Sequence, residues 1–169
     1  MKDNIVLIGI MGCGKSSLGK QAAKRLGMTF VDMDARIEQE AGMTISQMFE
    51  TFGETYFRDK ETELCHRLST QSGLVISTGG GIVGREENME ALRKTGRIIF
   101  IDRDPEIIVK TINAAKRPLI RDNPQRLFEI HQQRLPLYRK YADLTLSNNR
   151  SFYEAIRRLM AEIKKCSKQ

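Results

Sequence analysis

The sequence predicts an α/β domain of three layers, in which helices cover both faces of a parallel five-stranded sheet. Short apolar runs rich in Ile, Val and Leu alternate along the chain with amphipathic stretches of helical period. The runs are continuous rather than alternating, which is typical of strands buried on both faces. At 169 residues, 40% hydrophobic and 29% charged, the chain has the size and the apolar content of one ordinary domain. No repeat, low-complexity tract or linker divides it, so we expect a single domain over residues 1–169.

Five strands and the helices between them follow from this pattern, taken in chain order. We expect the strands at residues 4–9, 29–32, 74–78, 97–102 and 143–147. Parallel strands need crossover connections, and the intervening stretches supply them.

The helices are recognised by their apolar faces and by their ends. Residues 15–26 and 54–71 each carry an apolar face at helical spacing. Pro105 stands where the first position of a helix favours proline. Ser151 begins a capping box with the glutamate three positions on, which predicts a final helix through about residue 165.

Two regions do not fit a plain layered domain. Residues 34–60 hold two or three helices with no strand between them; Thr44 with Gln47 predicts a helix start there and Gly53 a stop. Residues 114–123 are polar, and long loops inside compact domains are often lids. We interpret 34–60 as a substrate-binding insertion and 114–123 as a lid.

Composition and charge exclude several classes of protein. No apolar run approaches the roughly 18 residues that span a bilayer, and the N-terminus does not have the form of a secretory signal. The three cysteines give neither a disulfide framework nor a zinc-ligand spacing. The net charge of +7 suits nucleic acid or small anions, but there is no tryptophan, no aromatic stacking motif and no compact basic stripe. We therefore expect a cytoplasmic protein that binds neither membrane nor nucleic acid, and we take a monomer as the default.

A glycine-rich segment after the first strand matches the phosphate-binding P-loop pattern G-x-x-x-x-G-K-[ST] in full. It reads Gly9-Ile10-Met11-Gly12-Cys13-Gly14-Lys15-Ser16, with Ser17 next. Its glycines allow backbone N–H groups to turn inward around phosphates, and the following helix adds the positive end of its dipole. Lys15 can reach the β- and γ-phosphates, and the Ser16 hydroxyl can ligate Mg²⁺. A dinucleotide-binding loop is disfavoured, because Ser17 stands where that pattern has its third glycine. The segment predicts a P-loop NTPase-type domain.

A pair of aspartates ends the second predicted strand. In a strand, residues two apart point the same way, so Asp32 and Asp34 would both face the crevice at the carboxyl edge of the sheet, where ligands bind in such folds. Hard oxygen ligands near a nucleotide suit Mg²⁺. The alternative is a solvated pair that caps the next helix.

Three further features address the molecule that accepts the phosphate. Gly79, Gly80 and Gly81 follow the third predicted strand, so their bare backbone would lie at the same sheet edge as the P-loop. Arg58 and Arg134 carry guanidinium forks that match carboxylates. A lone arginine on a helix is usually only solvated, so each is weak evidence by itself.

Taken together, these motifs resemble the shikimate kinase family over nearly the whole chain. The resemblance rests on the P-loop, on Asp32-Met33-Asp34, on Phe49, Gly53-Glu54, Phe57-Arg58 and Glu61, on Thr78-Gly79-Gly80-Gly81, on Arg117-Pro118-Leu119 and on Arg134-x-Pro136-Leu137-Tyr138. It implies a fold similar to the nucleoside-monophosphate kinases. It also implies transfer of the γ-phosphoryl of ATP to the 3-hydroxyl of shikimate, giving shikimate 3-phosphate and ADP, in the biosynthesis of aromatic amino acids.

The resemblance also implies roles for individual residues. Asp34 would hold the ring hydroxyls of shikimate, Arg58 and Arg134 its carboxylate, with the glycine triplet completing that site. Arg117 would reach over ATP from the lid, and Arg150 would contact adenine. Asp32 would order Mg²⁺ through water beside Ser16. Lys15, Asp34 and Arg117 would be the catalytic residues, and Gly12, Cys13, Gly14, Ser16 and Ser17 would complete the nucleotide site.

Three positions depart from the family pattern as we know it. Lys110 stands where we expect an arginine near adenine, which keeps the charge but loses planar stacking. Ser17 replaces the commoner threonine, and Ile120 replaces leucine after the lid arginine. These changes bear on nucleotide affinity and not on the reaction.

Two other functions remain open on sequence alone. One is another P-loop metabolite kinase, such as a gluconate or nucleoside-monophosphate kinase. The glycine triplet and the two arginines, which suit a carboxylate, disfavour it, since a phosphate-bearing acceptor demands a denser arginine cluster. The other is a nucleotide-binding regulator without kinase activity.

Overall fold

The computed structural model describes residues 3–111 and 123–166. Most of the predicted lid, including Arg117 and Ile120, lies outside these described residues.

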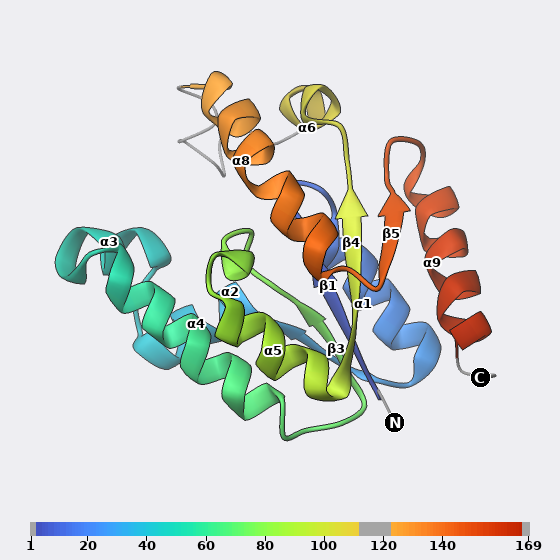
Figure 1. The fold of residues 1–169 in the computed structure, drawn as a ribbon, viewed down its shortest axis with the longest axis horizontal. Helices are drawn as coiled ribbons and strands as arrows, with labels where there is room; N and C mark the ends of the chain where they lie inside the picture. Colours follow the sequence, from blue (N-terminus) through green and yellow to red (C-terminus); the bar gives the residue numbers. More distant parts are fainter. Residues whose placement is uncertain (1–2, 112–122, 167–169) are drawn as a thin grey trace.

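The sheet has five parallel strands, as predicted. They are β1 (Asn4–Ile8), β2 (Thr29–Asp32), β3 (Leu74–Ser77), β4 (Gly96–Asp102) and β5 (Leu144–Ser147), in the order β2-β3-β1-β4-β5 (Figure 1). Each predicted strand is present, with ends that shift by at most one residue. The N-terminal strand lies at the centre of the sheet, which explains why all five of its residues are buried.

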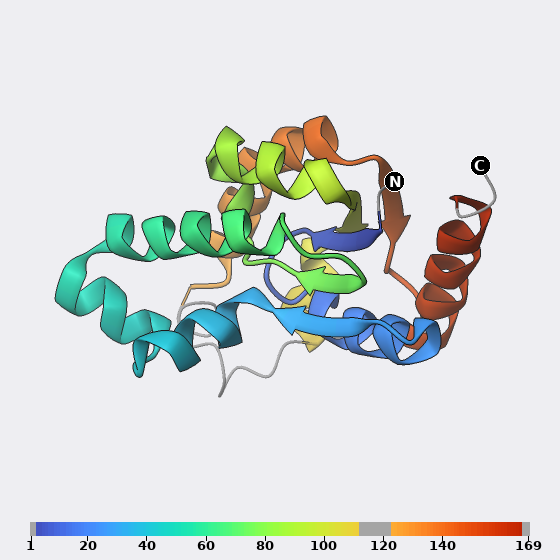
Figure 2. The same cartoon turned by 90° about the horizontal axis from the view of Figure 1, so that it is seen from below.

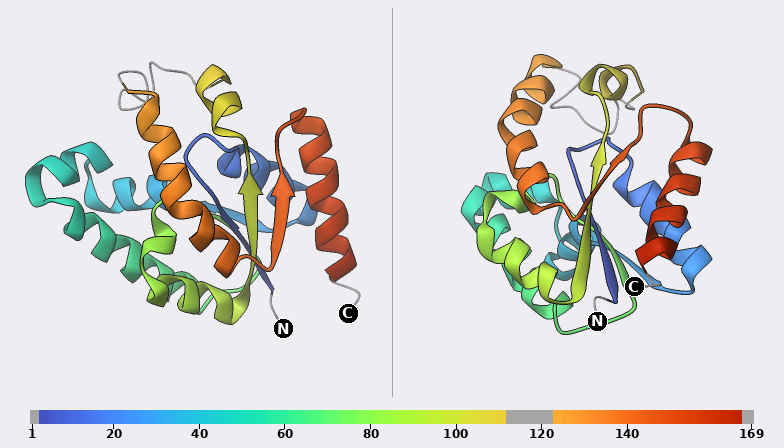
Figure 3. Two further views of the ribbon diagram at one scale, coloured as in Figure 1. Left: turned by 45° about the horizontal axis from the view of Figure 1, so that its top comes forward. Right: turned by 45° about the vertical axis from the view of Figure 1, so that its right-hand side comes forward.

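Helices cover both faces of the sheet, so the three predicted layers are confirmed. The helices α1 (Lys15–Leu26) and α9 (Phe152–Cys166) lie side by side on one face. The opposite face carries α5 (Glu86–Thr95) and α8 (Gln125–Tyr141) (Figures 2 and 3). Between α8 and the sheet, the rings of Phe100 and Tyr138 stack with centroids 5.1 Å apart, and both side chains are fully buried.

Three consecutive helices with no strand between them occupy residues 34–60, and the last of them continues beyond that range. They are α2 (Met33–Ala41), α3 (Ile45–Phe52) and α4 (Glu54–Leu68), and α3 projects away from the sheet (Figure 1). The predicted capping box at Thr44 and Gln47 is present. Gly53 ends α3 with φ 83°, a left-handed value that favours glycine. The helix α4 ends at Leu68 rather than at residue 71, because Ser69 and the residues after it turn back on the last carbonyls.

Two short helices complete the described chain, η1 (Ile82–Gly84) after β3 and α6 (Pro105–Thr111) after β4. Pro105 opens α6 as predicted, and the Asp104 carboxylate caps it by accepting from the backbone N–H of Glu106 at 2.9 Å. Within the described residues, no helix has both the length and the apolar character needed to cross a membrane.

Candidate active site

The carboxyl edge of the sheet brings four segments together, because parallel strands all end on the same side. The P-loop follows β1, Asp32 ends β2, the glycine triplet follows β3, and Asn148 follows β5.

The P-loop backbone adopts conformations that only glycine takes easily. Gly12 has φ 78° and Gly14 has φ 104°. At Gly9 a side chain is excluded by space as well, since a Cβ there would lie 2.7 Å from the carbonyl oxygen of Ile101. The loop therefore has the tight turn that the sequence pattern predicts.

Lys15 lies in the mouth of this loop and is only 7% exposed. Its ammonium group donates to the carbonyl oxygens of Gly9 at 2.7 Å and Ile10 at 3.0 Å. A buried charge of this kind needs polar partners, and here the loop's own backbone provides them.

Ser16 connects the P-loop to the end of β2. Its hydroxyl donates to Oδ2 of Asp32 at 2.6 Å and lies 3.2 Å from the hydroxyl of Ser77. The other carboxylate oxygen of Asp32 accepts from the backbone N–H of Ala35 at 3.3 Å, so Asp32 also caps α2. The predicted alternative, capping of the next helix, is therefore present at Asp32, and it uses a different oxygen from the one that faces Ser16.

Asp34 does not lie on the strand, where it was predicted, but its carboxylate still lies at the carboxyl edge of the sheet. The strand ends at Asp32 and Met33 already begins α2, so Asp34 lies in the first helical turn. The helix nevertheless carries its carboxylate to the triplet: a Cβ at Gly79 would lie 2.8 Å from Oδ1 of Asp34.

A second carboxylate, that of Glu61 on α4, reaches the same point. The same Cβ at Gly79 would lie 2.7 Å from Oε1 of Glu61. Glycine at this position therefore lets two acidic side chains pack directly against the backbone. Burial raises the pKa of the Glu61 carboxyl; the Arg58 charge opposes this shift and the nearby Asp34 adds to it.

The two predicted arginines both lie close to the triplet. Arg58 on α4 packs against Gly81, where a Cβ would lie 2.7 Å from the guanidinium carbon. It donates to Glu61 at 2.6 Å and to Glu54 at 2.9 Å. Arg134 on α8 also reaches the triplet, with Nη1 3.5 Å from the position of a Cβ on Gly80.

Two residues that position the loops had no role in the sequence analysis. The Tyr138 hydroxyl donates to the carbonyl oxygen of Gly80 at 2.6 Å, and the Asn148 side-chain amide donates to that of Cys13 at 2.8 Å. Tyr138 stood in a quoted motif, but Asn148 did not. Its only sequence signal was its place directly after a predicted strand, at the sheet edge where the ligands were expected.

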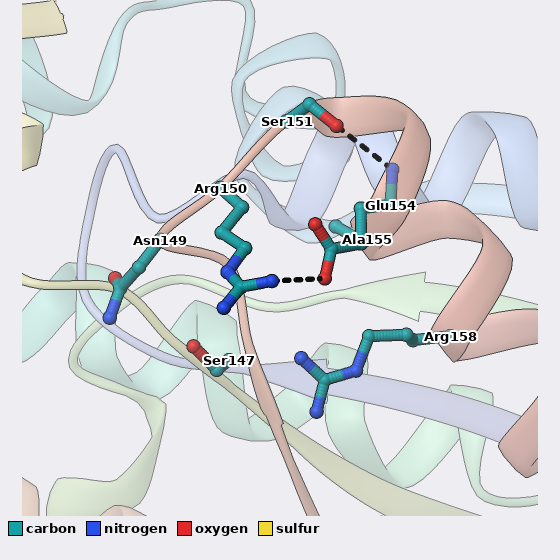
Figure 4. Close-up of a pocket in the computed structure, with 7 residues that line it drawn as sticks. All are labelled: Ser147, Asn149, Arg150, Ser151, Glu154, Ala155 and Arg158. Carbon is teal, nitrogen blue, oxygen red and sulfur yellow. Dashed lines mark hydrogen bonds and ion pairs between the residues drawn. The ribbon is translucent and has the colours of Figure 1, made fainter.

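Arg150 stands apart from these groups, in the loop between β5 and α9. Its side chain is 80% exposed and pairs with Glu154 at 3.4 Å. It lines a pocket of about 210 Å³ (Figure 4). Lys110 lies in the last turn of α6 and is exposed.

Comparison with known proteins now decides between the alternatives. A family model described as shikimate kinase matches residues 11–164. A shikimate kinase of Clostridium botulinum (strain Eklund 17B / Type B) is 41% identical over 165 residues, which cover 98% of this chain and 97% of that protein. The chain belongs to the shikimate kinase family. It is accordingly an ATP-dependent phosphotransferase that acts on a hydroxyl of shikimate.

Solved structures agree with this placement in the shikimate kinase family. A shikimate kinase from Acinetobacter baumannii in complex with shikimate superposes with a TM-score of 0.86 at 36% identity, covering 97% of this chain and 92% of that one. A gluconokinase from Sinorhizobium meliloti superposes with a TM-score of 0.65 at 14% identity, covering 99% of this chain and 95% of that one. The likeness to the gluconokinase shows a shared fold alone.

Proposed function

We propose that the chain transfers the γ-phosphoryl of ATP to the 3-hydroxyl of shikimate at the sheet edge between the P-loop and the glycine triplet. The observation that supports this most is the contact between the two loops. A Cβ at Gly80 would lie 3.4 Å from the backbone nitrogen of Met11 and 3.6 Å from the carbonyl oxygen of Gly9. A phosphate held by one loop and an acceptor held by the other would therefore be neighbours.

The acceptor side suits a small hydroxylated carboxylate. Arg58 and Arg134 would bind its carboxylate, because their guanidinium groups both lie close to the triplet. Asp34 would accept hydrogen bonds from its ring hydroxyls, and the backbone of Gly79, Gly80 and Gly81 would close the site. We assign the insertion, residues 34–60, to acceptor binding, since its helices supply Asp34 and Arg58.

The nucleotide side would use the P-loop backbone from Gly12 to Ser17. Lys15 would exchange the carbonyl oxygens of Gly9 and Ile10 for phosphate oxygens when ATP binds. We assign Arg150 to adenine. We assign Arg117 and the 114–123 lid to closure over ATP, which would keep water from the transferred group.

The residues at Ser16 fit a bound Mg²⁺. A hydroxyl and a carboxylate oxygen, 2.6 Å apart at the end of the P-loop, are hard ligands of the kind this ion prefers. Ser16 would hold the ion directly and Asp32 through water. When bound, the ion would neutralise charge on the phosphate oxygens.

Catalysis would then be mostly positioning and charge stabilisation around an in-line displacement. The acceptor oxygen forms a bond to the γ-phosphorus while the bond from that phosphorus to the bridging β-oxygen breaks, and ADP leaves. The proton of the hydroxyl passes to the Asp34 carboxylate. Lys15 and Arg117 would stabilise the charge on the γ-phosphoryl oxygens. We expect a monomer that works in the cytoplasm.

Turnover with and without shikimate tests this proposal. The parent chain should release ADP and form shikimate 3-phosphate only when shikimate is present. Asp34→Asn removes the group that orients the hydroxyl and takes its proton, so kcat should fall by about 100-fold or more, while ADP affinity stays within about twofold of the parent.

Asp59→Asn is the matched control, because Asp59 is an exposed aspartate of α4 that pairs with Arg85. It should turn over like the parent. Full activity in Asp34→Asn would refute the role of Asp34, and ATP binding without shikimate-dependent turnover would refute the acceptor assignment.

A further inference from the structure

The pocket between the β5–α9 loop and α9 has a lining that phosphate transfer does not explain. It measures about 210 Å³, and its walls include the side chains of Ser147, Asn149, Arg150, Ser151, Glu154 and Arg158 (Figure 4). Of these, only Arg150 has a place in the proposed reaction.

The charges in this pocket do not balance. Two guanidinium groups share it with one carboxylate, and Figure 4 shows Arg158 extending from α9 toward Ser147 on the same side as Arg150. Arg150 pairs with Glu154 at 3.4 Å. Arg158 makes no hydrogen bond or ion pair with any residue of 3–111 or 123–166. Among the described residues, the pocket therefore carries one positive charge without a counter-ion.

Neutral donors lie beside that charge. The Ser151 oxygen accepts from the backbone N–H of Glu154 at 3.2 Å, which leaves its own proton free to donate. Ser147 contributes a second hydroxyl from the end of β5. Guanidinium forks together with hydroxyl donors form the set that phosphate groups bind.

We propose that this pocket is a second anion site, separate from the P-loop, which binds the phosphate group of a small molecule or free phosphate through Arg158. Asn148, which lies between two lining residues, connects the pocket to the nucleotide site, because its side chain donates to the P-loop carbonyl of Cys13 at 2.8 Å. Occupancy of the pocket would therefore act on nucleotide affinity through Asn148.

Calorimetry with inorganic phosphate tests the proposal. The chain is first saturated with Mg²⁺ and a non-hydrolysable ATP analogue, so that the P-loop is filled, and ionic strength is held constant. The parent should bind one phosphate. Arg158→Gln should weaken that binding about tenfold or more, since a charge-assisted donor is lost. Arg158→Lys, which keeps the charge but loses the fork, should fall between the two.

Arg157→Gln is the matched control, because Arg157 is the neighbouring exposed arginine of α9 and does not line the pocket. It should bind phosphate within about twofold of the parent, and both glutamine variants should keep parental turnover in phosphate-free buffer. Replacing inorganic phosphate with glycerol 3-phosphate distinguishes the two sources, since tighter binding of the ester assigns the site to an organic phosphate.

Three results would overturn the proposal. These are no phosphate binding by the saturated parent, equal weakening in the Arg157 and Arg158 variants, and binding that appears only when the nucleotide is left out. The last would make the pocket part of the nucleotide site.

Discussion

Arg58 faces the glycine triplet because two glutamates of its own helix hold its guanidinium group. Glu54, one turn before it, is largely exposed, whereas the side chain of Glu61 is 1% exposed. Burying such an ion pair costs desolvation free energy, and in this site the pair fixes the position of the Arg58 guanidinium group. Because Glu61 is buried only in the folded chain, its pKa differs between the folded and unfolded states, and this difference can be measured.

Replacing Glu61 should change how stability depends on pH. Burial raises the pKa of Glu61 above its ordinary value of 4.5, so the folded chain binds this proton more tightly than the unfolded chain. The native state then holds more protons, and this group makes the free energy of unfolding fall as pH rises from about 4.5 through the raised pKa. In Glu61→Gln that fall should be absent, which urea unfolding at a series of pH values would measure.

Glu63→Gln is the control for this experiment, since Glu63 is an exposed glutamate of the same helix. It should keep the parental dependence on pH. Parallel curves for the parent and Glu61→Gln would contradict the raised pKa.

At the scale of elements, the glycine triplet after β3 can pack closely against its neighbours because it carries no side chains. Its backbone packs against two carboxylates at Gly79, against the P-loop at Gly80 and against a guanidinium group at Gly81. The turn does not require left-handed backbone, since none of the three has a positive φ. Close approach, and not conformational freedom, accounts for these glycines.

Gly79→Ala should therefore disable the acceptor side of the site selectively. The added methyl group would meet carboxylate oxygens at 2.7 and 2.8 Å, so Asp34 and Glu61 would have to move. We expect kcat/KM for shikimate to fall at least tenfold, while ADP binding changes little. Steady-state kinetics and ADP titration measure the two effects.

Gly84→Ala provides the comparison, because a Cβ at Gly84 meets nothing within 4 Å and its φ lies in the ordinary range. It should leave both quantities unchanged. A Gly79 variant that behaves like the Gly84 variant would contradict the packing described here.

The elements that could be predicted from the sequence are those that depend on residues close together in the chain. The P-loop, the Thr44 capping box and the start of α6 all rest on residues within a few positions of one another. The end of β2 at Asp32 was predicted, but the setting of Asp34 was not, because the Asp32 carboxylate caps the next helix and the strand ends two residues before Asp34. Asp34 reaches the triplet through the course of α2, which no spacing rule describes.

Side-chain contacts between segments far apart in the chain could not be predicted from the sequence. Arg58 and Arg134 could be selected for their chemistry, but their convergence on one triplet depends on how α4 and α8 pack. Asn148 gave even less signal, since an asparagine after a strand is ordinary. The family resemblance supplied the roles that the patterns alone left open.

At the scale of the whole molecule, Asn148 joins the last strand to the first loop. It is 5% exposed, its side chain donates to Cys13, and its backbone N–H donates to the Asp102 carbonyl at 2.7 Å. It also packs on the P-loop turn, where a Cβ on Gly14 would lie 2.6 Å from its amide nitrogen.

Asn148→Ala should weaken nucleotide binding, because it removes a side chain that supports the P-loop. The Cys13 carbonyl would lose its partner, so we expect a loss of about 1–3 kcal/mol in the free energy of unfolding and a severalfold weaker affinity for ADP. Urea unfolding and calorimetry measure these. Asn149→Ala, next in the chain but bonded to Asp104 instead, should bind ADP within about twofold of the parent; equal losses in both variants would contradict the role of Asn148.

The tie between Asn148 and Cys13 has a consequence for synthesis, because its two ends are 135 residues apart. The glycine-rich motif leaves the ribosome well before Asn148, and so does β1, which pairs with β3 and β4 at the centre of the sheet. Neither can reach its final form until later segments have emerged. A nascent chain that stops before residue 148 would carry the whole motif and still lack the support of its turn, so tight nucleotide binding requires that synthesis has passed residue 148.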